Sequence, residues 1–409
     1  MQNPNVKYLR EQNGSFALFS LEHNRIWCRR QTESAWSAPY CIAEGATAFS
    51  LCRYEDFTYL LYSTTDGRLQ LAASADLLQW EQRPLWQEGQ SRWQPTASFF
   101  LLPQKDAVHI IYPQLQAPNG SASLLYTYFQ KGQWHTPYQI DHFLPWNGTP
   151  FLGRRLGENH AILYYRSHRN IISARELLLA PFTIGSLSPL IQTGDTCVDF
   201  SILEDEDRLH LLYIVRSLFR TQVIYRYKQT AAISRPQVIW DGVNCDTCWL
   251  YREQNHLILF WTVNGQPMRC VCDNGVSFGP IERYTAPFPM QPMKAELVQA
   301  WDSRFTASEY IGDRQNGALP MLFPATASEP VQQLQAASTD TTITSDFSSD
   351  STERKDELEE LRSLLAQRSE ELSAVNARWK AQVDALQQQL QLLQDTQSLE
   401  SSAPEEPTS

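Results

Sequence analysis

The sequence predicts an all-β fold, a β-propeller of six to seven four-stranded blades, followed by a C-terminal helix. Two repeated markers predict the blades. An apolar run ending in an aromatic residue recurs at intervals of 43 to 53 residues, at Phe19, Tyr62, Tyr112, Tyr165, Tyr213 and Trp261. A large apolar residue, usually followed closely by proline, recurs in step at Trp36, Trp80, Trp134, Phe182, Ile233 and Phe278. Four short antiparallel strands at a period of about 48 residues are typical of a propeller blade.

A threonine opens most of these units and is followed by four to six mostly apolar residues, as a buried inner strand requires. The threonines are Thr47, Thr96, Thr149, Thr196 and Thr247, with Asn5 and Lys294 at the equivalent places near the ends. Two-residue hairpins are predicted at Asp66-Gly67, Asn119-Gly120, Asn264-Gly265 and Asn274-Gly275, because such turns need positive φ. Six blades fit residues 5–286. Residues 294–324 form either a shorter seventh blade or strands that close the ring.

Composition excludes several classes of protein. The 409 residues are 42% hydrophobic and include 12 Trp, 17 Tyr and 18 Phe, enough for a large core. No apolar run reaches the roughly 18 residues of a membrane helix, and no secretory signal opens the sequence, so we expect a cytoplasmic protein without a membrane partner. Residues 1–326 hold 29 acidic and 28 basic residues. We therefore expect no nucleic-acid partner, which would need a basic stripe.

We divide the chain into a propeller at residues 1–324, a disordered Ser/Thr-rich linker at 325–352, a coiled-coil helix at 353–397 and a disordered tail at 398–409. Apolar residues in the helix recur at heptad spacing, which predicts a homo-oligomer; the alternative is a single solvated helix. The residues of the predicted seam are Leu358, Leu361, Leu365, Leu372, Val375, Trp379, Leu386 and Leu393.

Two carboxylates break the pattern of their own repeat. Asp199 stands where other units have mainly apolar residues, and Glu296 stands where they have mainly apolar or aromatic residues, including Trp249. Both inner strands face the central channel, so we predict that Asp199, Glu296 and Trp249 contribute to a ligand site. The alternative is that Asp199 caps a turn or accepts backbone hydrogen bonds and that Glu296 is solvated at a closing strand.

Arginine recurs five residues after the threonine, or its equivalent, that opens a unit. Arg10, Arg154 and Arg252 occupy this fifth place on three blades and could direct three guanidinium groups toward a carboxylate or phosphate near the axis. Ordinary surface or inter-blade pairing is the alternative reading.

Cys245-x-x-Cys248 together with Cys270-x-Cys272 has spacing similar to that of metal ligands. However, Cys248 occupies the position that other units give to small core residues, such as Ala48 and Ala97. We therefore expect these cysteines to pack in the core, with no metal and no cofactor.

The segment Ser74-Ala75-Asp76-Leu77-Leu78-Gln79-Trp80 resembles the Ser-x-Asp-Leu-x-x-Trp phrase of furanosidase-type propeller glycosidases and, less closely, the Asp-box of sialidases. The resemblance covers seven residues of one blade. In those families the segment is a structural turn on an outer hairpin, so the resemblance implies the fold more than an activity.

Catalytic signatures of these families are missing from the sequence. Propeller glycosidases of this kind place a catalytic Asp on the first inner strand, but residues 5–9 contain none. An arginine triad with a nucleophilic Tyr and its Glu, which sialidases need, is not identified either. The sequence thus favours a non-catalytic binding or scaffold protein for a protein or glycan partner. The alternatives are a glycoside hydrolase or sialidase-like enzyme using Asp199 and Glu296, and a structural spacer.

Overall fold

The computed structural model divides into two compact units, Met1–Leu334 and Gln335–Ser409. The predicted coiled coil with its seam residues, the end of the chain and most of the linker lie outside the described residues, which are 2–32, 35–85, 99–115, 121–144, 151–205, 208–230, 232–253, 256–273, 276–284, 291–299, 305–314, 317, 319–320 and 328–330. Across these residues, no helix could span a membrane.

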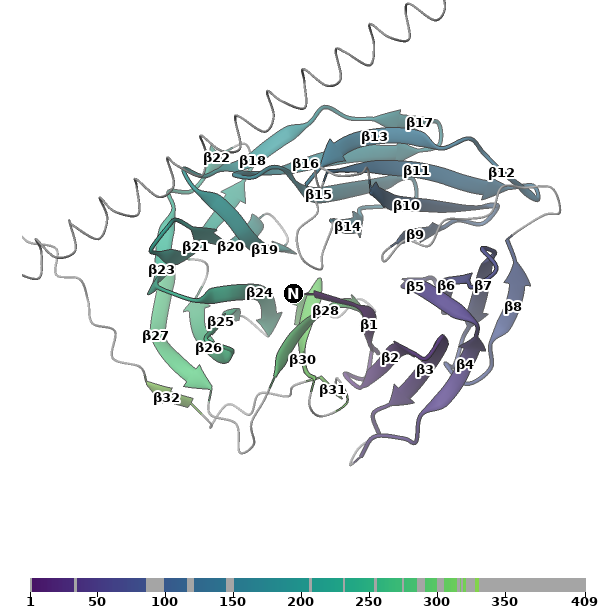
Figure 1. Cartoon of the computed structure of the whole chain (residues 1–409), viewed down its shortest axis with the longest axis horizontal. Coiled ribbons are helices and arrows are strands. Elements are labelled where there is room, and N and C mark those ends of the chain that lie inside the picture. The colour runs from purple at the N-terminus through teal and green to yellow at the C-terminus, as the bar shows by residue number, and fades with distance from the viewer. Residues whose placement is uncertain are drawn as a thin grey trace, which may run out of the picture. The chain divides into compact units, whose positions relative to one another are not determined.

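Six sheets, antiparallel except where β1 pairs with β28, are arranged in a ring around a common centre, which confirms the predicted propeller and fixes its blade number at six (Figure 1). Blade 1 contains β1 (Gln2–Arg10), β2 (Phe16–Glu22), β3 (Arg25–Arg30) and β4 (Tyr40–Glu44). Blade 2 contains β5 (Ala46–Tyr54), β6 (Phe57–Thr64), β7 (Leu69–Ser74) and β8 (Glu81–Pro84). Blade 3 contains β9 (Phe100–Pro103), β10 (Ala107–Leu115), β11 (Ala122–Gln130), β12 (Gln133–Trp134) and β13 (Tyr138–Phe143). Blade 4 contains β14 (Leu152–Arg155), β15 (His160–His168), β16 (Ile171–Leu179), β17 (Phe182–Ile184) and β18 (Ser188–Gln192).

Blades 5 and 6 follow the same order around the ring. Blade 5 contains β19 (Thr196–Asp205), β20 (Arg208–Arg216), β21 (Thr221–Gln229), β22 (Ala232–Ile233) and β23 (Gln237–Gly242). Blade 6 contains β24 (Cys245–Glu253), β25 (His256–Val263), β26 (Gln266–Asp273) and β27 (Ser277–Tyr284). In blades 3, 4 and 5 the outermost strand is split in two. Pro137 and Pro236 lie at two of these breaks and lack the N–H that a continuous ladder would use.

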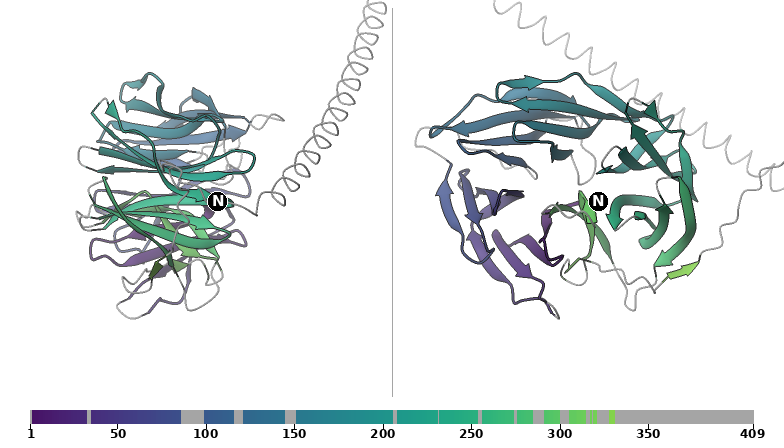
Figure 2. Two further views of the ribbon diagram at one scale, coloured as in Figure 1. Left: turned by 90° about the vertical axis from the view of Figure 1, so that its left-hand side faces the viewer. Right: turned by 180° about the vertical axis from the view of Figure 1, so that it is seen from behind.

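The last described strands close the ring and do not form a seventh blade. These are β28 (Pro292–Gln299), β29 (Phe305–Ala307), β30 (Glu309–Asp313), β31 (Leu319–Pro320) and β32 (Ser328–Pro330). Strand β28 pairs in parallel with β1 and antiparallel with β30, extending blade 1 into one seven-stranded sheet. Strands β29 and β32 instead add to blade 6. The right-hand view of Figure 2 shows the ring of blades from behind.

The core lies between blades. Six hydrophobic clusters each join two neighbouring sheets, so every blade buries both faces. All six repeated aromatic markers are 8% exposed or less. Across one such interface, the rings of Tyr126 and Phe182 stack with centroids 3.8 Å apart. The repeat in the sequence therefore records the positions that pack one blade against the next.

Two predicted hairpins have the expected backbone. Gly67 has φ of +77°, and Asn264 and Gly265 have φ of +51° and +74°. The positive φ values explain the glycine at both turns, and the positive φ of Asn264 suits asparagine, which tolerates this conformation. The pairs at 119–120 and 274–275 lie outside the described residues.

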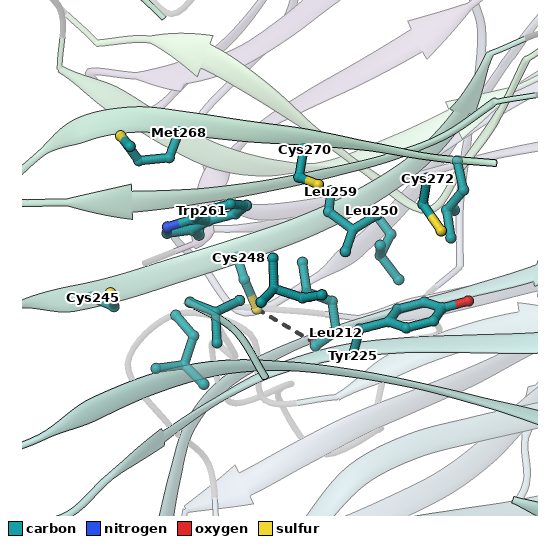
Figure 3. Close-up of a cluster of buried hydrophobic side chains, with 14 of the residues drawn as sticks. Leu212, Tyr225, Cys245, Cys248, Leu250, Leu259, Trp261, Met268, Cys270 and Cys272 are labelled. Carbon is teal, nitrogen blue, oxygen red and sulfur yellow. Dashed lines mark hydrogen bonds between the residues drawn. The ribbon is translucent and has the colours of Figure 1, made fainter. Parts of the chain in front are cut away.

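The four spaced cysteines lie in the hydrophobic cluster between blades 5 and 6 (Figure 3). Cys245, Cys248, Cys270 and Cys272 are each 1% exposed or less, and Cys248 Sγ donates a hydrogen bond to the carbonyl oxygen of Leu212 at 3.5 Å. Burial raises the pKa of the Cys245 and Cys270 thiols to about 12, so both stay protonated at neutral pH. In the described part of the chain, no group of three His, Cys, Asp or Glu side chains could hold a metal ion.

A buried ammonium group joins the closing strands to blades 5 and 6. Lys294 of β28 is 1% exposed, and its Nζ lies 3.2 Å from Asp199 Oδ2 and 3.1 Å from Glu309 Oε1. The same Nζ donates to the carbonyl oxygens of Phe200 at 2.8 Å and Cys248 at 3.0 Å. Burial alone lowers the pKa of Lys294, but the charges of Asp199 and Glu309 outweigh it, so the net shift is upward and the amine stays charged.

Glu309 completes this network from β30. Its carboxyl is fully buried and accepts a hydrogen bond from Ser201 Oγ at 2.9 Å. Burial raises the pKa of Glu309 to about 7, although Lys294 opposes the rise. Below this pH a proton on Glu309 leaves Asp199 as the single charged carboxylate beside the one ammonium of Lys294.

We predict that Lys294→Met destabilises the propeller by about 3–5 kcal/mol, because Asp199 and Glu309 then lose their buried cation. Chemical denaturation of the full chain measures the change. Lys105→Met, at an exposed lysine, is the control and should change the unfolding free energy by less than about 0.5 kcal/mol. Equal effects of the two substitutions would contradict the assignment.

Glu309→Gln should remove part of the pH dependence of stability. Folded Glu309 holds its proton to about pH 7, whereas an ordinary Glu releases it near 4.5, so unfolding between these values releases a proton. Stability of the wild type should therefore fall as pH rises through this window, by about 1–3 kcal/mol more than in the variant. Denaturation at pH 5 and pH 8 tests this, with exposed Glu81→Gln as control. The same slope in wild type and Glu309→Gln would refute the assignment.

Candidate functional site

A pocket of about 250 Å³ opens where the inner strands end. Its walls come from Lys7 of β1, from residues near the ends of β5 and β28, from Phe151 and the whole of β14, and from residues 99–102 and 306–308. Lys7 and Ser308, 301 residues apart in sequence, thus line the same pocket because propeller topology places every inner strand at the channel. The pocket combines apolar walls with a few polar and charged groups, as small-ligand sites do.

The ring of Phe100 forms an apolar wall of this pocket. Phe100 is half-buried and packs against Gly153 of the neighbouring blade. A Cβ atom on Gly153 would lie 2.4 Å from two ring carbons of Phe100, well inside van der Waals contact. The missing side chain of Gly153 therefore sets the position of the aromatic ring.

An ion pair lies deeper in the pocket. Lys7 is 3% exposed, and its Nζ contacts Glu296 Oε2. The Glu296 side chain keeps 28% of its surface exposed. The ammonium also lies 5.9 Å from the centre of the Phe49 ring. Glu296 thus lines the pocket and is paired with Lys7, which differs from the solvated carboxylate of the alternative interpretation.

Asp199 lies elsewhere and is not among the pocket-lining residues. Its Oδ2 accepts the backbone N–H of Cys248 at 2.9 Å in addition to the Lys294 ion pair. This geometry matches the structural alternative, in which Asp199 accepts backbone hydrogen bonds. The two carboxylates that the sequence singled out therefore have different surroundings.

The three fifth-place arginines do not converge on one point. Arg154 Nη1 lies 3.1 Å from Glu204, and Arg252 contacts Asp205, so consecutive acidic residues of blade 5 hold arginines from both neighbouring blades. The Arg10 guanidinium lies 6.0 Å from the centre of the Phe16 ring. Inter-blade pairing thus describes Arg154 and Arg252, although Arg154 also lines the pocket.

Trp249 lies in the core and not at the channel surface. It is 1% exposed and stacks on Phe260 with ring centroids 5.3 Å apart and an angle of 2° between the planes. The tryptophan stabilises the packing between blade 6 and the closing strands.

Sequence reasoning missed four pocket residues: Lys7, Arg53, Phe100 and Arg155. One signal was available, because Lys7 lies between the apolar residues Val6 and Tyr8, as Lys294 lies between Met293 and Ala295 in β28. Buried lysines require an anionic or carbonyl partner. Arg53 and Arg155 share a repeat position, six residues after Thr47 and Thr149, next to the fifth place that Arg154 occupies. Phe100 follows the apolar pattern of its strand and gives no such signal.

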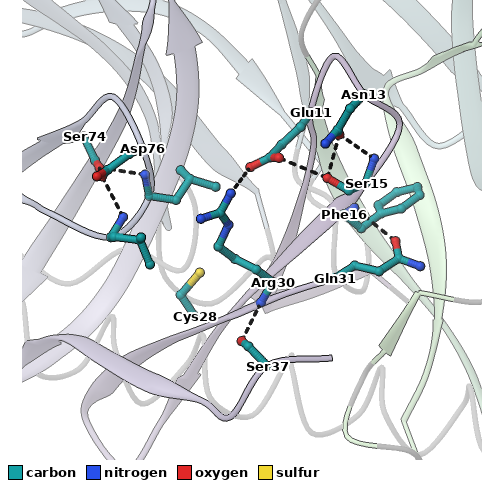
Figure 4. A network of polar contacts seen from close by, with 12 residues as sticks. Glu11, Asn13, Ser15, Phe16, Cys28, Arg30, Gln31, Ser37, Ser74 and Asp76 are labelled. Carbon is teal, nitrogen blue, oxygen red and sulfur yellow. Dashed lines mark hydrogen bonds and ion pairs between the residues drawn. The ribbon is translucent and has the colours of Figure 1, made fainter. Parts of the chain in front are cut away.

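The Ser74–Trp80 segment forms a turn on the outer part of blade 2 (Figure 4). Asp76 Oδ1 accepts the backbone N–H groups of Leu78 at 2.8 Å and Gln79 at 2.9 Å, and these bonds lower the pKa of the Asp76 carboxyl. Ser74 Oγ accepts the N–H of Leu77, whose φ is +63°. The segment is therefore a structural turn, as its resemblance implies. Figure 4 also shows Glu11 bound to Arg30 on blade 1.

No protein-family model matches the chain. No curated protein sequence matches it either.

Several solved structures are similar in fold. A fucose-specific lectin from Aleuria aurantia is 11% identical, with 68% of this chain and 94% of the lectin covered and a TM-score of 0.42. A thermostable family-43 glycoside hydrolase is 11% identical over 60% of this chain and 95% of its own, with a TM-score of 0.32. A prolyl endopeptidase is 10% identical over 76% and 48%, with a TM-score of 0.42. Such distant similarities carry no argument about activity.

Gly153→Ala should displace the Phe100 ring and destabilise the protein by about 1–3 kcal/mol, because the added Cβ overpacks the contact. Gly157→Ala is a matched control, since nothing lies within 4 Å of its Cβ position. Thermal and chemical denaturation compare the two. An equal effect at both glycines would show that the 2.4 Å approach is not a constraint.

Proposed function

We propose that this chain is a non-catalytic binding propeller that holds a glycan in the channel pocket. One observation carries the proposal: Phe100, Glu296 and Arg53 surround the same space of about 250 Å³. Sugars present apolar C–H faces and hydroxyl groups together. An aromatic ring beside charged and polar side chains is complementary to both.

The pocket volume sets the size of the ligand. It lies slightly below the roughly 300–1,000 Å³ of sites for drug-sized molecules. A single sugar residue or the end of a longer glycan suits this space. The amide of Gln299 and the hydroxyls of Thr306 and Ser308 add hydrogen-bonding groups to the walls.

The placement of the carboxylates supports binding without hydrolysis. Hydrolysis by two carboxyl groups needs both on either side of one glycosidic bond. Asp199 is held by Lys294 and by a backbone N–H outside the pocket, and Glu296 is paired with Lys7. Each carboxylate therefore has a cationic partner, and only Glu296 faces the pocket.

The C-terminal heptads of residues 353–397 add a second part to the proposal. A coiled coil there joins several propellers in one homo-oligomer. Linked sites bind a multivalent glycan surface more tightly than single sites do, because the second binding event becomes intramolecular. This arrangement compensates for the small area of each pocket.

Phe100→Ala should weaken glycan binding about tenfold, because the sugar loses its apolar contact. A glycan array probed with the full chain identifies the best sugar, which is then titrated against the variants. Phe219→Ala, at a ring that is 79% exposed and outside the pocket, is the control and should bind as the wild type does. Unchanged affinity of Phe100→Ala would place the ligand elsewhere.

Turnover of chromogenic glycosides by the wild type and by the two carboxylate variants, Glu296→Gln and Asp199→Asn, tests the catalytic alternative. No turnover is expected from the wild type. Turnover that Glu296→Gln or Asp199→Asn abolishes, while the melting temperature is kept, would contradict a non-catalytic role.

A further inference from the structure

We propose that the pocket binds a carboxylate group of its ligand, with Arg53 as the residue that pairs with it. The inference rests on the proposed glycan-binding function and names its substrate class: sugars that carry a carboxylate, such as uronic acids.

Arg53 is the starting observation. It lies near the end of β5, is half-buried and lines the pocket. Within the described part of the chain, no hydrogen bond or ion pair joins its guanidinium to another residue. The five N–H donors of this positive charge thus reach no acceptor among the described residues. A partly buried charge without a partner is costly, which favours a partner that arrives with the ligand.

Arg155 lies on the same pocket and is held in place by neutral groups. Its three guanidinium nitrogens donate to the carbonyl oxygens of Pro103 at 2.9 Å, Gly157 at 3.0 Å and Glu158 at 3.1 Å. The guanidinium also lies 4.1 Å from the centre of the Tyr54 ring. These contacts fix its position but do not neutralise its charge. Among the described residues, no carboxylate oxygen lies within 4.0 Å of it.

The charges of the pocket do not balance. Its described lining has four cationic side chains, Lys7, Arg53, Arg154 and Arg155, but Glu296 is its single carboxylate. Lys7 pairs with Glu296, and Arg154 pairs with Glu204 outside the lining. Four cations less these two pairs leave two positive charges, those of Arg53 and Arg155. The ligand that fits is therefore anionic.

A carboxylate suits this geometry. A planar guanidinium pairs with two oxygens of a carboxylate through parallel N–H···O bonds. The half-buried surroundings weaken screening by salt relative to a fully exposed pair. Arg155 then contributes its charge at longer range, since carbonyl groups already occupy its donors.

The test uses an array of uronate-containing glycans beside their carboxyl-reduced counterparts, probed with the full chain. We expect uronates to bind at least tenfold more tightly than the reduced forms. Arg53→Gln should abolish this preference and Arg53→Lys should restore part of it, because lysine keeps the charge without the planar fork. Arg235→Gln, at an exposed arginine outside the pocket, is the control. Melting temperatures verify that each variant is folded.

The outcomes separate the two claims. Equal binding of uronates and reduced glycans, or a preference that survives Arg53→Gln, overturns the carboxylate inference and keeps glycan binding. A silent array with Arg53-dependent thermal stabilisation by citrate overturns glycan binding and keeps the carboxylate site. Stabilisation by inorganic phosphate but not by citrate or uronates overturns the carboxylate inference in favour of a phosphate ligand. Silence in all three assays overturns both claims.

Discussion

The buried ammonium of Lys294 is the interaction on which the ring depends. Strand β28 joins β1 in parallel, so closure cannot use the consecutive hairpins that build each blade. Lys294 connects this strand to β19 and β24 through Asp199 and two backbone carbonyls, and to β30 through Glu309. Removing charges from water is costly. The network therefore favours one register of the closing strands over its alternatives.

The pocket is a consequence of this closure. Strand β28 contributes Lys294 to the closing network and, two residues later, Glu296 to the pocket. Residues 306–308, which lead into β30, line the same space. One segment thus both completes the ring and forms part of the candidate site. A change in its register would alter stability and binding together.

Much of the fold could be predicted from the sequence because a propeller repeats its packing positions. Phe19 and Trp261 are buried at equivalent places, and a period of about 48 residues records this. The sequence left two alternatives for residues 294–324, a seventh blade or closing strands, and could not decide between them, since β1 and β28 are distant in sequence and pair once. Asp199 and Glu296 were found as exceptions to the repeat, but their partners are lysines from other blades or strands, which periodicity does not relate.

The site was predicted less well for a related reason. Arg154 and Arg252 share a repeat position, and equivalence suggested one shared ligand; in the structure each pairs with an acidic residue of blade 5. Arg53 and Arg155 share the next repeat position, six residues after Thr47 and Thr149, but a shared position does not show that a guanidinium lacks a carboxylate partner. A crystal structure of the full chain with its best array glycan tests the central claim most directly. We expect sugar density in the channel pocket against Phe100; sugar density at the outer surfaces of the blades with an empty pocket would contradict glycan binding in the pocket.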